Sequence, residues 1–231
     1  MDLADGVYAL ELAIERPDGD VTFRPVAVET PKGPLLLDTG IPGQADALAD
    51  ALAAHGVALA DVRAVVLTHH DGDHAGSLSA VVDAAADPAV FVHEAAAPFV
   101  DGRSFPIKSD PQDGRYPAVP VDVELRDGVT FRTDAGPMRA VFTPGHAPGH
   151  LAFHFPEAGL LLAGDALRVE DGALVGPAEQ FTPDMAEATR SVGRLAELEV
   201  DTVHCFHGGT VDATSDEVAA VADSLAADRR D

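Results

Sequence analysis

Residues 62–76 read VRAVVLTHHDGDHAG and decide the fold class. The β-branched, apolar run at 62–67 is too short for a helix, so it predicts a buried strand. This strand leads directly into residues 68–74, THHDGDH, which gather three imidazoles and two carboxylates in one short segment. A strand that ends in a polar segment of this kind indicates an α/β protein whose chemistry lies at a sheet edge.

The spacing within this segment suggests two groups of ligands. In an extended loop, His69, Asp71 and Asp73 alternate onto one side, while His74 points elsewhere. The segment can therefore offer two ligands to each of two metal ions. Gly76 is predicted to open the helix that follows.

Four other segments also follow apolar strands, and they contain Asp38, His146, Asp165 and His207. A lone histidine is more often structural than a ligand. Imidazoles and carboxylates that recur at several strand ends are different, because divalent transition metals prefer these ligands. The single cysteine, Cys205, excludes an intramolecular disulfide framework and a thiolate-only metal cage.

Hydrophobic periodicity and turn residues predict the remaining elements. Strands are predicted at 7–14, 21–28, 34–37, 62–67, 89–92, 121–125, 129–133, 138–143, 151–155, 160–163 and 202–206. Helices are predicted at 44–55, 76–85, 94–100, 183–198 and 215–227. The first two strands form a hairpin with a turn at Pro17-Asp18-Gly19-Asp20, and 101–120 is a long, proline-rich loop of the kind that is often functional.

This order of elements suggests two sheets back to back with helices outside, in a single domain spanning 1–231. No apolar run approaches the ~20 residues of a membrane span. The first residues lack the basic and apolar pattern of a secretory signal, so we expect a soluble, cytoplasmic protein. The oligomeric state is left open.

Five ordered motifs resemble those of the metallo-β-lactamase-fold hydrolases. They are LLDTG at 36–40, THHDGDHAG at 68–76, TPGHAPGH at 143–150, GD at 164–165 and HGG at 207–209. The resemblance runs from about residue 7 to residue 212. It implies a four-layer αββα sandwich, with two mixed β-sheets packed face to face and helices outside. It also implies a dinuclear metal centre and hydrolytic chemistry.

The resemblance also assigns the metal ligands. His69 and His146 would bind the first metal, Asp73, His74 and His207 the second, and Asp165 would bridge both. Asp38 would hold a ligand imidazole through a hydrogen bond. The expected cofactor is two divalent ions, Zn²⁺ first, with Mn²⁺ or Fe²⁺ as alternatives.

The motif departs from the family at Asp71, where the family has a histidine. If Asp71 binds the first metal, three aspartates and a bridging hydroxide balance two divalent ions, which makes the metals weaker Lewis acids and favours harder ions. In the alternative, Asp71 is not a ligand and only the metal beside Asp73 and His74 binds tightly.

The predicted activity is metal-dependent hydrolysis of a small carboxylic ester, thioester or lactone. A metal-bridging hydroxide attacks the substrate, and Asp73 orients this nucleophile and helps to move a proton. Substrate choice in this fold resides in loops. The chain shows about 20 residues after Gly209, so we expect no C-terminal helical substrate domain of the hydroxyacylglutathione hydrolase kind.

Two alternatives remain. One is a nucleic-acid phosphodiesterase, for which Arg103, Lys108 and Arg115 are the modest basic candidates among several aspartates. Nucleic acid is therefore not the expected partner. The other is a metal-binding protein without turnover, for which Asp71 is the hint.

The other histidines are predicted to be mainly structural. His150 is expected to support the site through hydrogen bonds, and His70 to point away from the metals. His154 is expected to pack at the surface or in the core, and His55 to lie at a helix end. His93 is the one that could face a substrate. Cys205 is expected to be a small buried hydrophobe.

The charge of the chain is unusually negative. There are 39 Asp and Glu residues against 15 Lys and Arg, a net charge of −24, and 27 of the acids are Asp while Lys32 and Lys108 are the only lysines. No run of like charges forms a tail, and 46% of the residues are hydrophobic, so the chain is expected to fold. The composition resembles that of proteins from extreme, salt-accumulating halophiles, where molar salt screens the repulsion between carboxylates.

Overall fold

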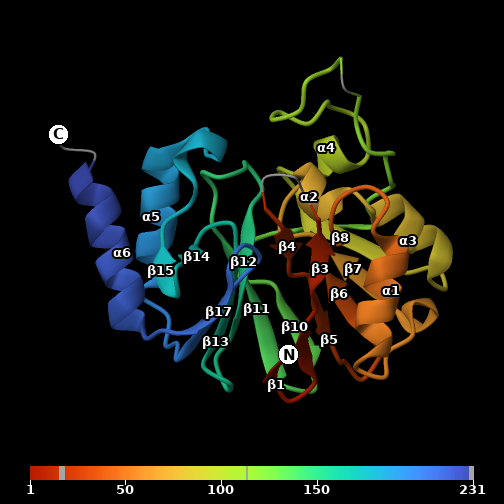
Figure 1. Cartoon of the computed structure of the whole chain (residues 1–231), viewed down its shortest axis with the longest axis horizontal. Coiled ribbons are helices and arrows are strands. Elements are labelled where there is room, and N and C mark those ends of the chain that lie inside the picture. The colour runs from red at the N-terminus through yellow and green to blue at the C-terminus, as the bar shows by residue number, and fades with distance from the viewer. Residues whose placement is uncertain (16–18, 113, 229–231) are drawn as a thin grey trace. The chain divides into compact units, whose positions relative to one another are not determined.

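The structure, a computed structural model, describes residues 1–15, 19–112 and 114–228. Contacts divide the chain into two compact units, Met1–Leu125 and Arg126–Asp231 (Figure 1). Each unit contains one mixed β-sheet and its own helices, so the predicted α/β class with two mixed sheets is confirmed. The single-domain organisation stays a prediction.

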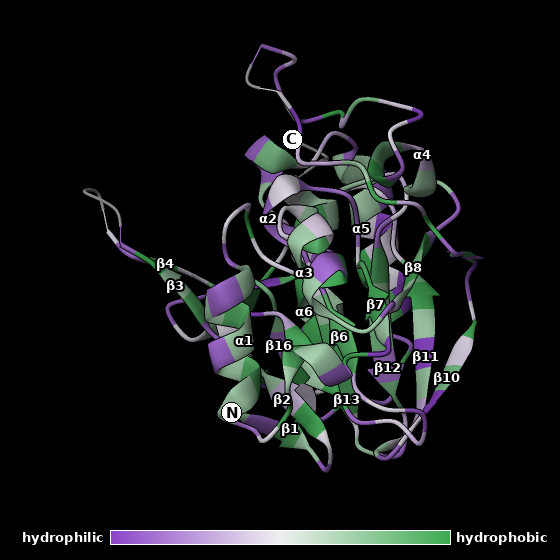
Figure 2. Ribbon diagram, turned by 90° about the vertical axis from the view of Figure 1, so that its right-hand side faces the viewer, coloured by the Kyte–Doolittle hydropathy of each residue, from purple (hydrophilic) through white to green (hydrophobic). Residues whose placement is uncertain are grey.

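The first unit is built on a seven-stranded sheet of order β1-β2-β5-β6-β7-β8-β9. Its strands are β1 (Asp2–Ala4), β2 (Val7–Ala9), β5 (Val26–Val28), β6 (Leu35–Leu37), β7 (Ala64–Val66), β8 (Ala89–His93) and β9 (Val123–Leu125). The last four strands are mutually parallel. Figure 2 shows β6 and β7 in the green of hydrophobic residues, as expected for central parallel strands that are buried on both faces.

The helices of this unit follow its parallel strands. They are α1 (Ala45–Ala53), α2 (Gly72–Ala75), α3 (Leu78–Ala84) and α4 (Ala97–Val100), with a 3₁₀ turn at Leu59–Asp61. In α1, Leu48 and Leu52 lie one turn apart and are both fully buried, which explains why this amphipathic segment is helical. The predicted helix 44–55 therefore exists, and its ends are shorter by one or two residues.

The predicted N-terminal hairpin is present but interrupted. β3 (Leu12–Ile14) and β4 (Val21–Phe23) form a separate two-stranded sheet, although their pairing keeps the register of β2 with β5. The ladder breaks beside Pro25, whose nitrogen has no hydrogen to donate. The predicted turn begins at Pro17 and Asp18, which lie outside the described residues.

The second unit is built on a six-stranded sheet of order β10-β11-β12-β13-β16-β17. Its strands are β10 (Thr130–Thr133), β11 (Gly136–Phe142), β12 (Leu151–Phe155), β13 (Leu160–Gly164), β16 (Thr202–Cys205) and β17 (Gly209–Asp212). β13 and β16 are parallel, and the other pairs are antiparallel. Every residue of β12 and β13 is buried.

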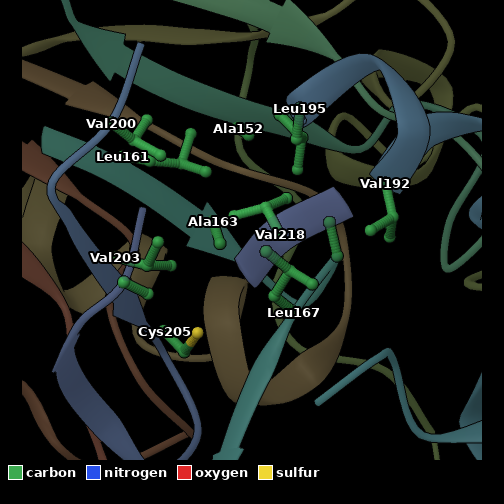
Figure 3. Packing of buried hydrophobic residues seen from close by; sticks show 12 residues of the cluster. Ala152, Leu161, Ala163, Leu167, Val192, Leu195, Val200, Val203, Cys205 and Val218 are labelled. Atoms are coloured by element: carbon green, nitrogen blue, oxygen red, sulfur yellow. The ribbon is translucent and has the colours of Figure 1, made fainter. Parts of the chain in front are cut away.

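Two helices, α5 (Met185–Leu195) and α6 (Ser215–Asp228), run side by side in this unit (Figure 1). A core of small and branched side chains joins them to the sheet, as the close-up in Figure 3 shows. It contains Leu161 and Ala163 from β13, Val192 and Leu195 from α5, and Val218 from α6. A 3₁₀ turn at Glu179–Phe181 precedes α5, and Asp184 caps this helix by accepting the backbone N–H of Glu187.

A small hairpin of β14 (Arg168–Glu170) and β15 (Ala173–Val175) is present in the structure but was not predicted. Its two-residue turn is Asp171-Gly172, and both residues have positive φ angles, 50° and 78°. This is the type I′ geometry for which an Asp-Gly pair is the strongest short-range signal. The sequence therefore contained the evidence for this hairpin. Among the residues that the structure describes, no helix combines the length and the apolar character needed to cross a membrane.

Candidate metal centre

The segment after β7 places the first group of predicted ligands, but not in the predicted way. Asp71 is still extended, with φ −67° and ψ 151°, and its carbonyl accepts the N–H groups of His74 and Ala75. Helix α2 therefore begins at Gly72, and Asp73 and His74 are helical residues. The predicted alternation of side chains along an extended loop is wrong for Asp73, and Gly76 ends this helix rather than opening the next one.

Asp38 fixes the orientation of His74. Asp38 follows β6 in the left-handed region at φ 63°, and its carboxylate is buried. One oxygen accepts the backbone N–H of Thr68, and the other accepts the Thr68 hydroxyl and His74 Nδ1, each at 2.8 Å. With its proton on Nδ1, His74 presents Nε2 as the nitrogen that can bind a metal. The expected hydrogen bond between a predicted ligand imidazole and the Asp38 carboxylate is thus present.

Thr68 fixes His69 through the same network. Because the Thr68 hydroxyl donates to Asp38, its oxygen accepts from Nδ1 of His69 at 3.0 Å. His69 Nε2 then lies 3.2 Å from Oδ2 of Asp71, and the rings of His69 and His74 lie 4.0 Å apart. His74 Nε2 is 3.9 Å from Oδ2 of Asp73. The first unit therefore brings together the four predicted ligands His69, Asp71, Asp73 and His74.

The second unit brings together the other three predicted ligands. Asp165 follows β13, and its Oδ2 lies 3.3 Å from His146 Nε2 and 3.4 Å from His207 Nε2. Two atoms that bind one metal at about 2.0–2.2 Å with tetrahedral angles lie about 3.3–3.5 Å apart. The spacing between each imidazole nitrogen and this carboxylate oxygen would therefore fit shared coordination of a divalent ion.

Two further contacts hold this second group in place. His146 Nδ1 lies 3.3 Å from the Thr182 hydroxyl oxygen, which itself donates to the Ala178 carbonyl, so Nδ1 is the protonated nitrogen. His150 accepts the backbone N–H of Asp165 on Nε2 at 3.0 Å, and its Nδ1 contacts the Thr143 hydroxyl at 2.7 Å. Both ring nitrogens of His150 are engaged in this way, which confirms its predicted role as a hydrogen-bonding support.

Two glycines next to predicted ligands allow close backbone packing. Gly145 has φ 126°, and a Cβ there would lie 2.2 Å from the backbone nitrogen of Ala188 in α5. Gly208 has φ 92°, and a Cβ there would lie 2.0 Å from the carbonyl oxygen of Val169 in β14. A side chain at either position would therefore clash with this neighbouring backbone, and the positive φ angles also favour glycine.

Sequence reasoning missed the contacts made by the loop at 101–120. Lys108 Nζ lies 2.5 Å from Asp71 Oδ2, and the Tyr116 hydroxyl donates to the His70 carbonyl at 2.7 Å. Arg115 donates to the carbonyls of Phe99 and Ser104. These contacts join residues up to 46 positions apart, and no local pattern marks them.

The other histidines are held by structural contacts. His70 stacks on Phe99 with ring centroids 4.2 Å apart, and His93 Nδ1 accepts the N–H of Ala95 at 3.1 Å. His154 lies 2.9 Å from the carbonyl of Glu199, and His55 stacks on Tyr8 just after α1. The contacts of His154 and His55 agree with their predicted places. His70 Nε2 also lies 3.9 Å from Oδ1 of the predicted ligand Asp71, so its predicted direction away from the metals stays a prediction, as does a substrate contact of His93.

Cys205 is buried as predicted. Burial raises the pKa of its thiol well above the ordinary value, and the Asp165 carboxylate acts in the same direction. The thiol is therefore not a candidate nucleophile.

Comparison with known proteins identifies the family of these motifs. The sequence model described as the metallo-beta-lactamase superfamily matches residues 26–207. The chain is 26% identical, over 90% of its length and 85% of the relative, to the protein named "Probable metallo-hydrolase YflN" of Bacillus subtilis. It is 34% identical, over 67% of its length, to the hydroxyacylglutathione hydrolase of Fuscovulum blasticum, and it covers 50% of that enzyme.

Solved structures agree with the sequence match. A metallo-beta-lactamase family protein from Thermus thermophilus matches 99% of this chain and 81% of its own, with a TM-score of 0.76 and 28% identity. The predicted metallo-β-lactamase-like fold is therefore confirmed. The chain spans about half the length of the hydroxyacylglutathione hydrolases and lactamase-like proteins that it matches.

Proposed function

Because the chain belongs to the metallo-beta-lactamase superfamily, we propose that it is a metal-dependent hydrolase of a small carboxylic ester, thioester or lactone. Members of this superfamily typically bind divalent metals. The observation that carries the proposal is the pattern of donor atoms in the two units. In each unit, histidine Nε2 atoms lie 3.2–3.4 Å from an aspartate oxygen, and hydrogen bonds at Nδ1 keep the ring lone pair of His69, His74 and His146 on Nε2.

We assign the ligands as the motifs suggest. His69 and His146, with or without Asp71, would hold one ion, Asp73, His74 and His207 the other, and Asp165 would contact both. The bound ions, Zn²⁺ first and Mn²⁺ or Fe²⁺ as alternatives, would supply an activated water and polarise the substrate carbonyl.

The chain's own residues would control the proton. Asp73 lies in the first turn of α2 with its side chain 31% exposed, so it is accessible to solvent on one side. It would orient the attacking water and pass its proton toward the leaving group. Asp38 and Thr68 would keep His74 and His69 in the tautomer that binds a metal.

The basic residues of the long loop support a small substrate over a nucleic acid. Arg103 pairs with Asp101 and Glu124, Lys108 pairs with Asp71, and Arg115 donates to backbone carbonyls. The loop therefore holds its three cations against acceptors of its own unit, whereas a nucleic-acid site presents cations to phosphates. Several relatives are named hydroxyacylglutathione hydrolase, which adds thioesters to the substrates worth testing first.

The test is a substrate panel at high salt with Zn²⁺ or Mn²⁺. It contains p-nitrophenyl esters, acyl thioesters, lactones and bis-p-nitrophenyl phosphate. We expect turnover of at least one ester, thioester or lactone, and loss of about 10²–10⁴-fold in kcat for Asp73→Asn. Asp83→Asn, which removes an exposed carboxylate from α3, is the matched control and should keep full activity. Turnover of the phosphodiester alone would overturn the substrate class, and turnover of none would favour a metal-binding protein.

A further inference from the structure

Lys108 contacts Asp71, the residue at which the motif departs from the family. The long loop brings its ammonium to 2.5 Å from Oδ2 of Asp71, which stands where the family has a histidine. The side chains of Lys108 and Asp71 are only 19% and 12% exposed. Exposed ion pairs contribute little to stability. Solvent and salt screen a largely buried pair only weakly, so its charges strongly affect other charges nearby.

The same oxygen of Asp71 also faces His69. Nε2 of His69 lies 3.2 Å from Oδ2, and the hydrogen bond at Nδ1 leaves a lone pair on Nε2. Two electron-rich atoms at this distance repel each other unless a positive charge accompanies them. Lys108 supplies one such charge, and a divalent ion bound by His69 and Asp71 would supply another. The ammonium and the divalent ion would both bind the same carboxylate oxygen of Asp71.

The charges of this pair also cancel. Asp71 at −1 and Lys108 at +1 sum to zero, which equals the charge of the neutral imidazole that the family has at this position. The loss of Lewis acidity expected from an unpaired aspartate is therefore offset by the lysine. The pair replaces a histidine in charge, but it offers a carboxylate that is already bound to a cation.

The loop is held so that Lys108 stays at this place. Arg115 donates to the carbonyls of Phe99 and Ser104 at 2.6 and 3.0 Å, and Tyr116 donates to the His70 carbonyl next to Asp71. Arg103, in the same loop, has a side chain that is 57% exposed and pairs with Asp101 and Glu124. Of these two cations, Lys108 contacts the segment of predicted ligands, whereas Arg103 contacts Asp101 and Glu124.

We propose that Lys108 determines metal affinity at the His69–Asp71 position, because its ammonium competes with a divalent ion for Asp71 Oδ2. This inference rests on the proposed metal centre. It assigns tight binding to the position of Asp73 and His74 and weak binding to the position of Asp71. Lys108 then causes the difference in metal affinity between these two positions.

The test measures metal binding rather than turnover. Metal-free protein is titrated with Zn²⁺ in a metal buffer, and bound zinc per chain is measured by atomic emission. We expect wild type to bind one ion tightly and a second weakly, and Lys108→Met to bind the second at least about tenfold more tightly. Lys108→Arg keeps the charge and should keep the weak second site. Lys32→Met removes the other lysine, which is exposed on the surface of the same unit, and should leave both affinities unchanged.

A double variant identifies the route of the effect. If the ammonium acts through Asp71, Asp71→Asn combined with Lys108→Met should lose the gain in affinity. An unchanged second affinity in Lys108→Met, or an equal gain in Lys32→Met, would overturn the role of Lys108 and leave the proposed hydrolase intact. Absence of any bound zinc in wild type would overturn both.

Discussion

Asp38 decides which nitrogen of His74 presents its lone pair, although it is 36 residues away in the chain. Its three accepted hydrogen bonds come from Thr68 and His74, and an asparagine can accept at only one of its two terminal atoms. In Asp38→Asn the amide NH₂ would face the Thr68 hydroxyl and His74 Nδ1. His74 would then favour the other tautomer, with its proton on Nε2.

We therefore expect Asp38→Asn to weaken metal binding at the His74 position by about 10–100-fold. The measurement is the zinc titration described above, with the folded state checked by circular dichroism. Asp122→Asn is the matched control, because the Asp122 carboxylate accepts a backbone N–H from Val90 in the same unit, away from the predicted ligands. An equal loss in Asp122→Asn would show that the effect reflects general destabilisation rather than the tautomer of His74.

Arg115 is the anchor of the loop at 101–120. Hydrogen bonds from a charged donor contribute about 1.5–3 kcal/mol each, and Arg115 makes close bonds to two carbonyls outside its own neighbourhood. We expect Arg115→Met to lower the free energy of opening the loop by about 3 kcal/mol, which corresponds to roughly 100-fold faster amide exchange at 104–109. Hydrogen–deuterium exchange with mass spectrometry measures this.

The same loop provides the comparison for this prediction. Arg103→Met removes exposed ion pairs to Asp101 and Glu124, so exchange should change by no more than about fivefold. If both substitutions accelerate exchange equally, charge alone holds the loop and the carbonyl contacts of Arg115 do not.

Local signals predicted most elements, and the misses have physical causes. The strand at Leu151–Phe155 and the ligand segments after β7 and β13 were predicted because apolar runs and polar strand ends are visible within a few residues. The contact between Asp71 and Lys108 was not predicted, because the two residues are 37 positions apart in the sequence and only the folded loop brings them together. Asp73 was placed in an extended loop but lies in helix α2, because nothing in the composition showed that the Asp71 carbonyl accepts the first N–H groups of this helix.

At the scale of the whole molecule, the −24 charge opposes folding at low ionic strength. Like charges repel over about 10 Å at 0.1 M salt and over only about 3 Å at 1 M. The buried core consists mainly of apolar side chains, so this repulsion acts on the surface and not on the buried packing. The halophilic interpretation of the composition therefore becomes a statement about stability that can be measured.

We predict that the unfolding temperature rises with KCl between about 0.1 and 2 M. If screening relieves about 4 kcal/mol of repulsion, a chain of this size gains roughly 8–16 °C. A variant with four exposed carboxylates neutralised, Asp50→Asn, Asp83→Asn, Glu197→Gln and Asp223→Asn, has a net charge of −24 + 4 = −20 and should gain less from salt. Differential scanning calorimetry of both proteins in KCl and in sucrose separates screening from exclusion of cosolvent, since sucrose carries no charge. An equal rise in sucrose, or an identical salt dependence of the two proteins, would show that the surface charge does not set the salt requirement.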